Sequence, residues 1–318
     1  TASLCSLWDG DGVLIPHVIP FANLSYPFPG SIINPDGMRT PNHKWMPGNK
    51  TTMDDTIRRM TLSNRQGWDA LAAVHARTYD IDRLLAGRPL LNEVIQREVG
   101  DVCDKSLIHL LCHIGTDTLS WALLGARVTG VDISPKSLEV ARGLAWELRV
   151  DADFIESNIL DLTQKVQNKF DIVFSSTGVL CWLPDINAYA RSVRRLLKNG
   201  GFFYLFDGHP FRNLLLDENG EVHPEHIVGD YFRKRVWEYE GMGDYTDPDF
   251  LTPTPSYEWD WTLGEVVTAL CDAGLRIEFL HEFPQYYYSG YTPYDIEDNK
   301  VEPYPCTFSL KASAPRKG

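Results

Sequence analysis

The sequence has little positive charge. It carries 30 Lys and Arg against 43 Asp and Glu, so its formal net charge is -13. A protein that binds polyanions needs a basic face, and this balance argues against nucleic acid or an anionic membrane as a partner. The one dense basic stretch, "RSVRRLLK" at residues 191–198, alternates with apolar residues at helical spacing. That spacing is typical of the solvated face of a helix.

Long apolar runs and close cysteine pairs are missing as well. No run approaches the ~20 residues of a membrane-spanning helix, and the first residues do not resemble a secretory signal. The six cysteines form no Cys-x-x-Cys pair, and Cys112, Cys181, Cys271 and Cys306 stand among apolar or aromatic residues. This pattern favours reduced, buried thiols over a disulfide framework. We therefore expect a cytoplasmic protein.

Proline and glycine are dense near the start of the chain. In residues 1–55 they alternate with aromatic residues, as in "YPFPGSIINPDGMRTPNHKWMPGN". Such density breaks helices and interior strands, while the aromatic residues supply surface for burial. The pattern predicts an irregular arm laid over a main domain at residues 56–313, with a loose tail at 314–318. The arm is expected to cover its own active site or that of a neighbour in a homodimer.

From residue 107 onward, strand-like and helix-like segments alternate. Apolar runs predict strands at Leu107–Leu111, Arg127–Asp132, Asp153–Glu156, Phe170–Ser175 and Gly201–Phe206, with two more in "LRIEFLHEF" and "CTFSLKA" near the end. Helical stripes separate the first five. Short strands that alternate with helices predict an α/β fold, namely a Rossmann-like, doubly wound and mostly parallel seven-stranded sheet with helices on both faces.

Two segments flank or interrupt this alternation. Trp68, Leu71, His75 and Tyr79 fall on one helical face, and Ser63 or Asn64 is suited to cap the start of that helix. Residues 209–260 break the rhythm with aromatic, strand-like stretches, which predict an inserted hairpin or lid.

The turn after the first strand reads "CHIGTD" over Cys112–Asp117. A dinucleotide site needs Gly-x-Gly-x-x-Gly there, so that the backbone can approach a pyrophosphate. Only Gly115 remains, His113 and Ile114 are bulky, and no lysine follows as in a nucleoside triphosphate site. The turn therefore favours a nucleoside without phosphates.

Two polar residues suit such a nucleoside. Asp132 ends the second strand, where its carboxylate can accept hydrogen bonds from both ribose hydroxyls, and Asn158 follows the third strand, where its amide can pair with an adenine edge. Each also has a structural interpretation: Asp132 can cap the helix that starts near Ser134, and Asn158 can hold a turn.

The order of these motifs resembles a known family. The stretches "HIGTDTLSWALLGARVTGVDISPKSLEVAR", "FIESNILDL" and "FDIVFSSTGVLCWLPDINAYARSVRRLLKNGGFFYLFDGHPF" are similar to class I S-adenosylmethionine-dependent methyltransferases, in particular to the small-molecule branch whose first motif reads His-Ile-Gly-Thr-Asp-Thr. The resemblance spans residues 64–312. In the wider family an acid stands at the position of His109, and glycines stand at those of Leu111 and His113, so the cofactor site is expected to be differently lined.

The resemblance implies S-adenosylmethionine as the cofactor and S-adenosylhomocysteine as its product. It implies cofactor contacts from the following residues: Tyr79, His113, Gly115, Asp132, Ile133, Asn158, Ile159, Ser175 and Thr177.

Methyl transfer from a sulfonium needs alignment of the two reactants and removal of a proton where the acceptor carries one. His209 and Asp207, in "LFDGHPF" after the fifth strand, are the predicted catalytic residues, and His113 and Glu282 are weaker candidates. A structural alternative has His209 hydrogen-bonding the lid, with Asp207 orienting it or binding substrate.

Aromatic residues around the predicted mouth suit a planar or cationic acceptor. The predicted substrate pocket contains Trp182, Tyr257, Trp259 and Tyr286. The acceptor is expected to be a small aromatic or amine-containing metabolite. No metal is expected, since His223-Pro-Glu-His226 offers only two histidines in an acidic loop.

Three other functions fit parts of the same sequence. A cofactor-assisted cyclase would keep the fold and produce a rearranged product without S-adenosylhomocysteine. A non-catalytic subunit would bind S-adenosylmethionine beside a partner protein without turnover. A nicotinamide dehydrogenase is disfavoured by the missing glycines.

Overall fold

A computed structural model describes residues 50–215, 217, 223, 226–232, 236–241, 243–247, 249–287 and 301–315. Residues 1–49 of the predicted arm and residues 316–318 of the predicted tail lie outside these ranges. Within them, no helix combines the length and the hydropathy that a membrane crossing requires.

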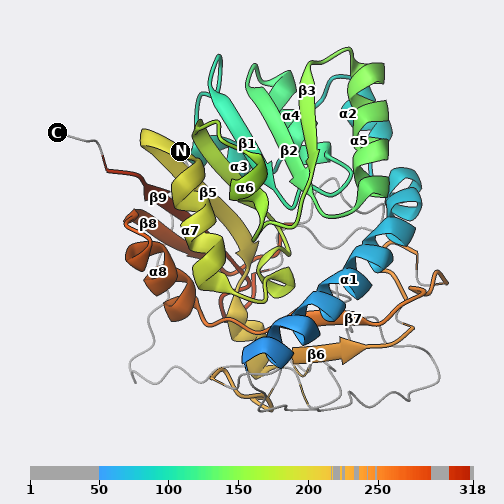
Figure 1. The fold of residues 1–318 in the computed structure, drawn as a ribbon, viewed down its shortest axis with the longest axis vertical. Helices are drawn as coiled ribbons and strands as arrows, with labels where there is room; N and C mark the ends of the chain where they lie inside the picture. Colours follow the sequence, from blue (N-terminus) through green and yellow to red (C-terminus); the bar gives the residue numbers. More distant parts are fainter. Residues whose placement is uncertain are drawn as a thin grey trace, which may run out of the picture.

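The main sheet has seven strands in the order β3-β2-β1-β4-β5-β9-β8 (Figure 1). Neighbours from β3 to β5 are parallel, and β9 runs antiparallel to both β5 and β8. The strands are β1 (Ser106–Leu110), β2 (Arg127–Asp132), β3 (Ala152–Glu156), β4 (Phe170–Ser176), β5 (Leu197–Gly208), β8 (Arg276–Phe283) and β9 (Thr307–Ser313). The predicted doubly wound, mostly parallel sheet is confirmed.

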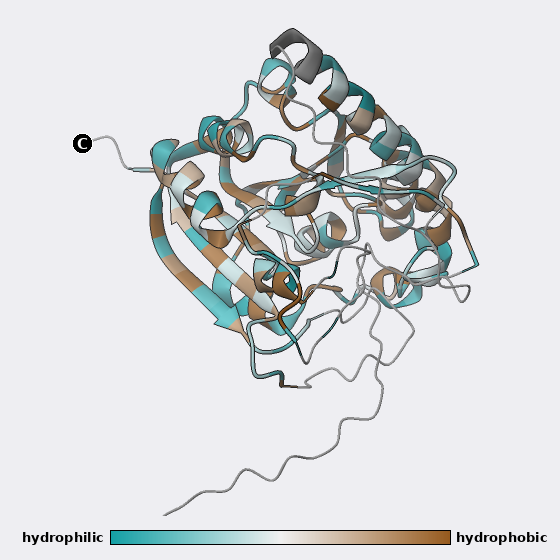
Figure 2. Ribbon diagram, turned by 90° about the horizontal axis from the view of Figure 1, so that it is seen from below, coloured by the Kyte–Doolittle hydropathy of each residue, from teal (hydrophilic) through white to brown (hydrophobic). Residues whose placement is uncertain are grey.

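Helices cover both faces of this sheet. On one face α7 and α8 bury a cluster with Ile108, Val173 and Leu205. On the other, Leu107, Ile172 and Tyr204 pack against Trp121 of α4 and the apolar side of α3. Bands of hydrophilic and hydrophobic residues along the helices in Figure 2 are the pattern of amphipathic helices. The helices are α2 (Ile81–Leu85), α3 (Glu93–Val99), α4 (Thr116–Leu123), α5 (Pro135–Leu148), α6 (Leu162–Lys165), α7 (Ile186–Leu196) and α8 (Leu263–Asp272).

Several helix boundaries follow from local capping. Ser134 caps α5 by accepting a hydrogen bond from the backbone N–H of Ser137, and Asp185 caps α7 in the same way. Thr262 and Glu265 form the reciprocal capping box at the start of α8 that their spacing predicts. These side chains satisfy backbone donors that would otherwise be left unpaired at each helix start.

Helix α1 (Lys50–Thr78) begins earlier than the sequence predicts. Residues 50–55 of the predicted irregular arm are helical, and Ser63 and Asn64 lie inside the helix instead of capping it. Their side chains bind the chain just before and within β7: Ser63 Oγ donates to the Pro255 carbonyl, and Asn64 pairs with both backbone groups of Tyr257. The side chains of Ser63 and Asn64, which the sequence predicts as helix caps, therefore bind a distant segment of the chain instead.

The insertion, residues 209–260, contains β6 (Val236–Tyr239) and β7 (Ser256–Trp259), which pair as a two-stranded antiparallel sheet. A short 3-10 helix, η2 (Pro210–Leu214), stands at the start of the insertion, and a second, η1 (Leu180–Trp182), contacts β7. Figure 1 shows α1 crossing this small sheet below the carboxyl ends of the central strands. The predicted insertion thus forms a separate layer over one end of the main sheet.

Candidate cofactor and acceptor site

A cavity opens where the strand order reverses. Strands β2 and β3 extend from one side of β1 and β4 from the other, so β1 and β4 form the switch point at which open α/β sheets bind ligands. The cavity is lined by the turn after β1, the ends of β2, β3 and β4, helix α1 and the insertion. Its lining includes Trp68, Tyr79, His109, His113, Asp117, Asp132, Ile133, Asn158, Ile159, Thr177, Trp182, Asp244, Tyr245 and Glu258.

The turn after β1 has the backbone conformation of a glycine-rich loop, although it contains only one glycine. Leu111 has φ 57°, His113 has φ 49° and Gly115 has φ 78°. Leu111 and His113 are the two positions at which the wider family carries glycine, and both adopt the left-handed conformation that glycine favours. The loop therefore retains its path, while the leucine and histidine side chains add walls to the cavity.

Gly115 acts through backbone shape and not as part of the cavity wall. A Cβ atom there would lie 2.9 Å from Ala141 Cβ and 3.1 Å from Phe154 Cε1. We expect Gly115→Ala to lower the free energy of unfolding by about 2–4 kcal/mol, from the positive φ and the overpacking together. Gly143→Ala is the control, because Gly143 is exposed in α5 with open space around its Cα. Chemical denaturation should show that variant more stable by about 0.5–1 kcal/mol.

Asp132 ties the turn to the end of β2. Its Oδ2 accepts the His113 N–H at 2.8 Å, and its Oδ1 accepts the Ser134 N–H at 2.8 Å. Burial raises the pKa of Asp132 to about 6, although backbone hydrogen bonds from Ser134, His113 and Ile133 oppose that shift. Each carboxylate oxygen has a second lone pair, so Asp132 can hold the turn and still accept hydrogen bonds from a ligand.

Asn158 also combines a structural bond with a place in the cavity. Its Oδ1 accepts the Leu160 N–H at 2.9 Å, which is the turn-holding role. A bond to an adenine edge would therefore use the Nδ2 amide. Ile133 and Ile159 line the same end of the cavity and supply apolar surface for a planar base.

His109 replaces the usual acid at the end of β1. Burial lowers the pKa of His109 to about 3, so the ring is neutral. Its Nδ1 lies 2.8 Å from Thr118 Oγ1. Nearby, the buried Asp117 of α4 accepts a 2.6 Å hydrogen bond from Ser176 Oγ. A carboxylate is thus present at the floor of the cavity, carried by the helix instead of the strand.

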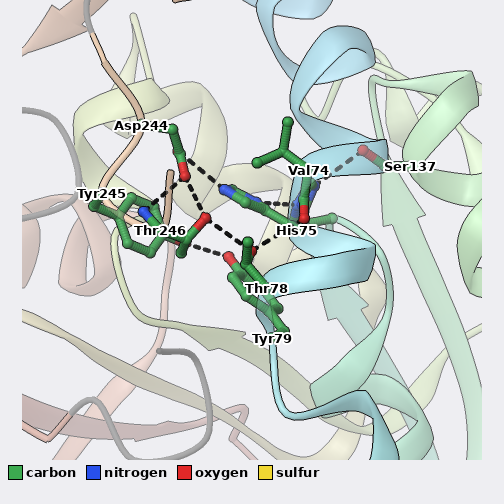
Figure 3. A network of polar contacts seen from close by, with 9 residues as sticks. Val74, His75, Thr78, Tyr79, Ser137, Asp244, Tyr245 and Thr246 are labelled. Carbon is green, nitrogen blue, oxygen red and sulfur yellow. Dashed lines mark hydrogen bonds and ion pairs between the residues drawn. The ribbon is translucent and has the colours of Figure 1, made fainter. Parts of the chain in front are cut away.

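A buried chain of polar groups joins α1, the turn and the insertion (Figure 3). His75 Nε2 lies 3.0 Å from Asp244 Oδ2, and His75 Nδ1 lies 2.7 Å from His113 Nε2. His113 Nδ1 continues the chain to Ser137 Oγ at 3.0 Å. Burial and the charge of His75 lower the pKa of His113 well below its usual range. His113 is therefore neutral and shapes the cavity wall.

Asp244 is held from several directions. Burial alone would raise the pKa of Asp244, but the hydrogen bond and charge of His75, with hydrogen bonds from Thr246, hold it below its usual range. Thr78 Oγ1 of α1 donates to Thr246 Oγ1 at 2.8 Å, and the Tyr79 and Tyr245 hydroxyls are hydrogen-bonded. These contacts, together with Figure 3, show residues 244–246 of the insertion fastened to the end of α1.

Glu258 was not identified from the sequence. It is 9% exposed and lines the cavity from β7. Burial raises the pKa of Glu258 to about 8, with Arg212 lowering it and Asp260 raising it. Its signal in the sequence is its place in the strand-like, alternating stretch "SYEWDW", in which it stands on the face opposite Tyr257 and Trp259.

The structure places five of the predicted contact residues outside the cavity lining. Gly115 lies behind it, and the buried Ser175 pairs with the Tyr189 hydroxyl at 2.7 Å, while its neighbour Ser176 faces the cavity. Tyr257 turns away to hydrogen-bond Glu238. Alternation along a strand explains these corrections, because successive side chains point to opposite faces. Trp259 lines an adjoining cavity instead, and Tyr286 lies beyond β8 with a hydrogen bond to Tyr304.

Asp207 and His209 also lie outside this cavity and line the adjoining one. Asp207 is buried and accepts backbone N–H groups from Gly178, Val179, Leu180 and Gly208, with lengths between 2.6 and 3.1 Å. Those four bonds give it the role of holding the turn around η1.

His209 has a similar structural role. Its Nδ1 accepts the Phe211 N–H at 3.0 Å, and its Nε2 pairs with Glu282 at 2.9 Å. Burial lowers the pKa of His209, although Glu282 opposes that shift. The geometry corresponds to the structural alternative for His209, in which it hydrogen-bonds the insertion.

Metal ligands do not gather in the part of the chain that the structure describes: no three His, Cys, Asp or Glu side chains meet in a group suited to an ion. His223, one of the two histidines considered, pairs with Asp217 at 2.9 Å.

Comparisons with known proteins agree with this fold. A family model described as a methyltransferase domain matches residues 109–205, from β1 to β5. The ubiquinone biosynthesis O-methyltransferase of Xanthomonas euvesicatoria pv. vesicatoria is 30% identical over 214 residues, covering 66% of this chain and 80% of the relative. That of Xanthomonas oryzae pv. oryzae is 31% identical over 141 residues, covering 43% and 58%. The chain therefore spans only 58% of the length of several curated relatives.

A solved structure shows the same fold. An S-adenosylmethionine-dependent methyltransferase from Listeria monocytogenes aligns with a TM-score of 0.50 and 18% identity, over 68% of this chain and 94% of that protein. The chain belongs to the class I S-adenosylmethionine-dependent methyltransferases. S-Adenosylmethionine is the cofactor of this family of enzymes, as the resemblance implies and as the turn allows.

Proposed function

We propose that this protein transfers a methyl group from S-adenosylmethionine to a small-molecule acceptor, an aromatic or amine-containing metabolite. The observation that carries the proposal is one cavity lined by two different sets of groups. Asp132 and Asn158, which follow β2 and β3, suit a nucleoside. Trp68, Trp182 and residues of the insertion suit an apolar acceptor.

At the cofactor end, the residues present fit S-adenosylmethionine. Asp132 would accept the ribose hydroxyls, Asn158 Nδ2 would meet the adenine edge, and Ile133 and Ile159 would contact its faces. The bound cofactor supplies an electrophilic methyl group on a sulfonium. The protein needs to align the acceptor with it and to exclude water.

Aromatic rings line the acceptor part of the cavity. Trp68 of α1 and Trp182 pack edge to face with ring centroids 5.1 Å apart, and further residues of α1 and the insertion line the same cavity. Such a site suits a small molecule better than a folded protein or a polymer. The relatives are named as O-methyltransferases of ubiquinone biosynthesis, which also supports a small acceptor.

Calorimetric titration with S-adenosylhomocysteine, with NADH beside it, tests the proposal. We expect micromolar or tighter binding of S-adenosylhomocysteine and none of NADH. Candidate acceptors are then incubated with S-adenosylmethionine, and products are identified by mass spectrometry. Methylated products with equal amounts of S-adenosylhomocysteine support methyl transfer. Rearranged products without it favour the cyclase alternative, and binding without any turnover favours the non-catalytic subunit.

Asp117 is the candidate for the ammonium group in the methionine part of the cofactor, because it supplies a buried carboxylate in the cavity floor where the strand has lost its acid. We expect Asp117→Asn to weaken S-adenosylhomocysteine binding about tenfold, as the loss of one charge-assisted hydrogen bond. Methylthioadenosine, which lacks the amino-acid part, provides the control ligand. An equal loss of affinity for both ligands would show that Asp117 acts only through the fold.

A further inference from the structure

A buried carboxyl group stands at the junction of two cavities. Glu258, with Thr177 and Gly178, lines both the cofactor cavity and the adjoining one around Trp237, Trp259 and Trp261. Its residue surface is 9% exposed. In the part of the chain that the structure describes, no hydrogen bond or ion pair engages the carboxyl oxygens of Glu258. The carboxyl oxygens reach the cavities, where a ligand can supply the hydrogen-bond donor that the protein does not.

The position of this carboxyl is built into the fold. Asn64 of α1 accepts the Tyr257 N–H and donates to the Tyr257 carbonyl, both at 2.7 Å, which fixes β7 against α1. Alternation along β7 then directs Ser256 and Glu258 into the cavity and Tyr257 away from it. The carboxyl is therefore held by a strand whose register is pinned on the adjacent residue.

The surrounding charges favour a cation. The described lining of the cofactor cavity contains four acids, Asp117, Asp132, Asp244 and Glu258, and it contains neither Lys nor Arg. Asp132 and Asp244 already accept protein hydrogen bonds, and Asp117 accepts one from Ser176. Among these four acids, Glu258 is the one whose carboxyl oxygens accept no hydrogen bond from the described residues. Its oxygens are therefore available to a ligand.

The charged and titratable groups that interact with Glu258 come from three neighbouring places. Arg212 of η2 and Asp260, two residues along the chain, act on the charge of Glu258. The half-buried Cys181 thiol of η1 is close enough for the charge of Glu258 to raise its pKa. Arg212 lines the adjoining cavity and not the cofactor cavity. Trp68 and Trp182 add aromatic rings to the same cavity, which favour a cation near their faces.

We propose that Glu258 is the acceptor-binding residue of this site and that the acceptor is a protonated amine attached to an apolar ring. This inference rests on the proposed methyl transfer and names the acceptor class that the same cavity takes. The amine would pair with the Glu258 carboxylate, while the ring of the acceptor would lie beside Trp68 and Trp182.

The same carboxylate provides the proton acceptor that methylation of an ammonium ion requires. The ammonium proton passes to Glu258, and the nitrogen lone pair forms the new C–N bond as the C–S bond breaks and its electrons go to sulfur. The products are an N-methylated ammonium ion, S-adenosylhomocysteine and protonated Glu258, which then releases its proton to water. Because burial raises the pKa of Glu258 to about 8, its carboxylate is a stronger base than an exposed one.

The test uses matched pairs of probes on protein saturated with S-adenosylhomocysteine: benzylamine against benzyl alcohol, and phenethylamine against phenethyl alcohol. Calorimetry should show the amines binding at least about tenfold more tightly than the alcohols. In Glu258→Gln the preference should disappear through a loss of amine affinity, with alcohol affinity unchanged. Glu238→Gln, which removes a charge from β6 outside both cavity linings, should behave as the wild type.

A second readout separates pairing from a structural role. Titrations at pH 7 in buffers of different ionisation enthalpy should show release of about one proton per bound amine, because most of Glu258 is protonated before the ammonium arrives. That release should be lost in Glu258→Gln. Unchanged S-adenosylhomocysteine affinity reports that the variant is folded; if it is lost, Glu258→Asp replaces it and should retain the preference for amines.

The outcomes are distinguishable. Failure of the wild type to bind S-adenosylhomocysteine would overturn the proposed function itself. Binding of S-adenosylhomocysteine together with equal affinity for amines and alcohols, or with a preference that persists in Glu258→Gln, would overturn the amine assignment and leave methyl transfer in place.

Discussion

Replacing Asp132 by alanine is expected to weaken S-adenosylhomocysteine binding by about 100-fold or more. The carboxylate would accept hydrogen bonds from the ribose, and bonds to a charged group contribute about 1.5–3 kcal/mol each. Its removal also leaves the His113 and Ser134 N–H groups without their acceptor, which loosens the turn that forms the cavity. Isothermal titration calorimetry measures the change directly, and methylthioadenosine should lose affinity as well because it keeps the ribose.

Asp153→Ala is the matched control. Asp153 is exposed on the neighbouring strand β3, so the variant removes the same charge without touching the cavity. Its affinity should equal that of the wild type. Equal affinities for Asp132→Ala and the control would remove the ribose assignment.

The same carboxylate predicts a pH dependence. Burial raises the pKa of Asp132 from 3.8 to about 6, and only the ionised form accepts hydrogen bonds from the ribose on both oxygens. S-Adenosylhomocysteine affinity should therefore fall about tenfold as the pH is lowered to one unit below that pKa. The effect on folding has the opposite sign. The raised pKa of Asp132 adds stability to the folded protein below pH 3.8, and this stability is lost as the pH rises through about 6. The prediction is therefore tested by measuring binding affinity and not protein stability.

Asp244→Ala is expected to lower the free energy of unfolding by about 1–3 kcal/mol, the range for leaving a buried hydrogen-bonding group without its partner. Asp244 faces His75, which is fully buried, and its carboxylate is the group that joins the insertion to α1. Chemical denaturation followed by fluorescence measures the loss. The folded-state pKa of Asp244 is lowered, so wild-type stability should also decrease as the pH falls through that depressed value.

Asp249→Ala provides the comparison, because Asp249 is an exposed acid in the same segment. That variant should change stability by no more than about 0.5 kcal/mol. The double variant His75→Leu, Asp244→Leu should recover part of the loss, since neither partner then remains buried without the other. If Asp244→Ala is as stable as Asp249→Ala, the contact does not fasten the insertion.

The sequence by itself determined the layout of the domain. The apolar runs, the helical stripes and the capping box at Thr262 and Glu265 are local patterns, and each element follows from interactions within a few residues. The parallel sheet followed because strands joined through helices pack in that way. The position of the cofactor turn, Asp132 and Asn158 followed in turn, because strand ends meet at one edge of such a sheet.

Tertiary structure decided which side chains reach the cavity. Strand register decides whether Ser175 or Ser176 faces the cavity, and likewise whether Tyr257 or Glu258 does. A shift of one residue would exchange the two members of each pair. Asp207 and His209 lie at the end of a strand, as catalytic residues often do. Asp207, however, accepts hydrogen bonds from backbone N–H groups, and His209 binds the Phe211 N–H and Glu282.

His75 and Asp244 are far apart in the chain, and only the docking of the insertion on α1 brings them together. Local sequence patterns carry secondary structure, whereas the chemistry of this site comes from contacts between distant segments.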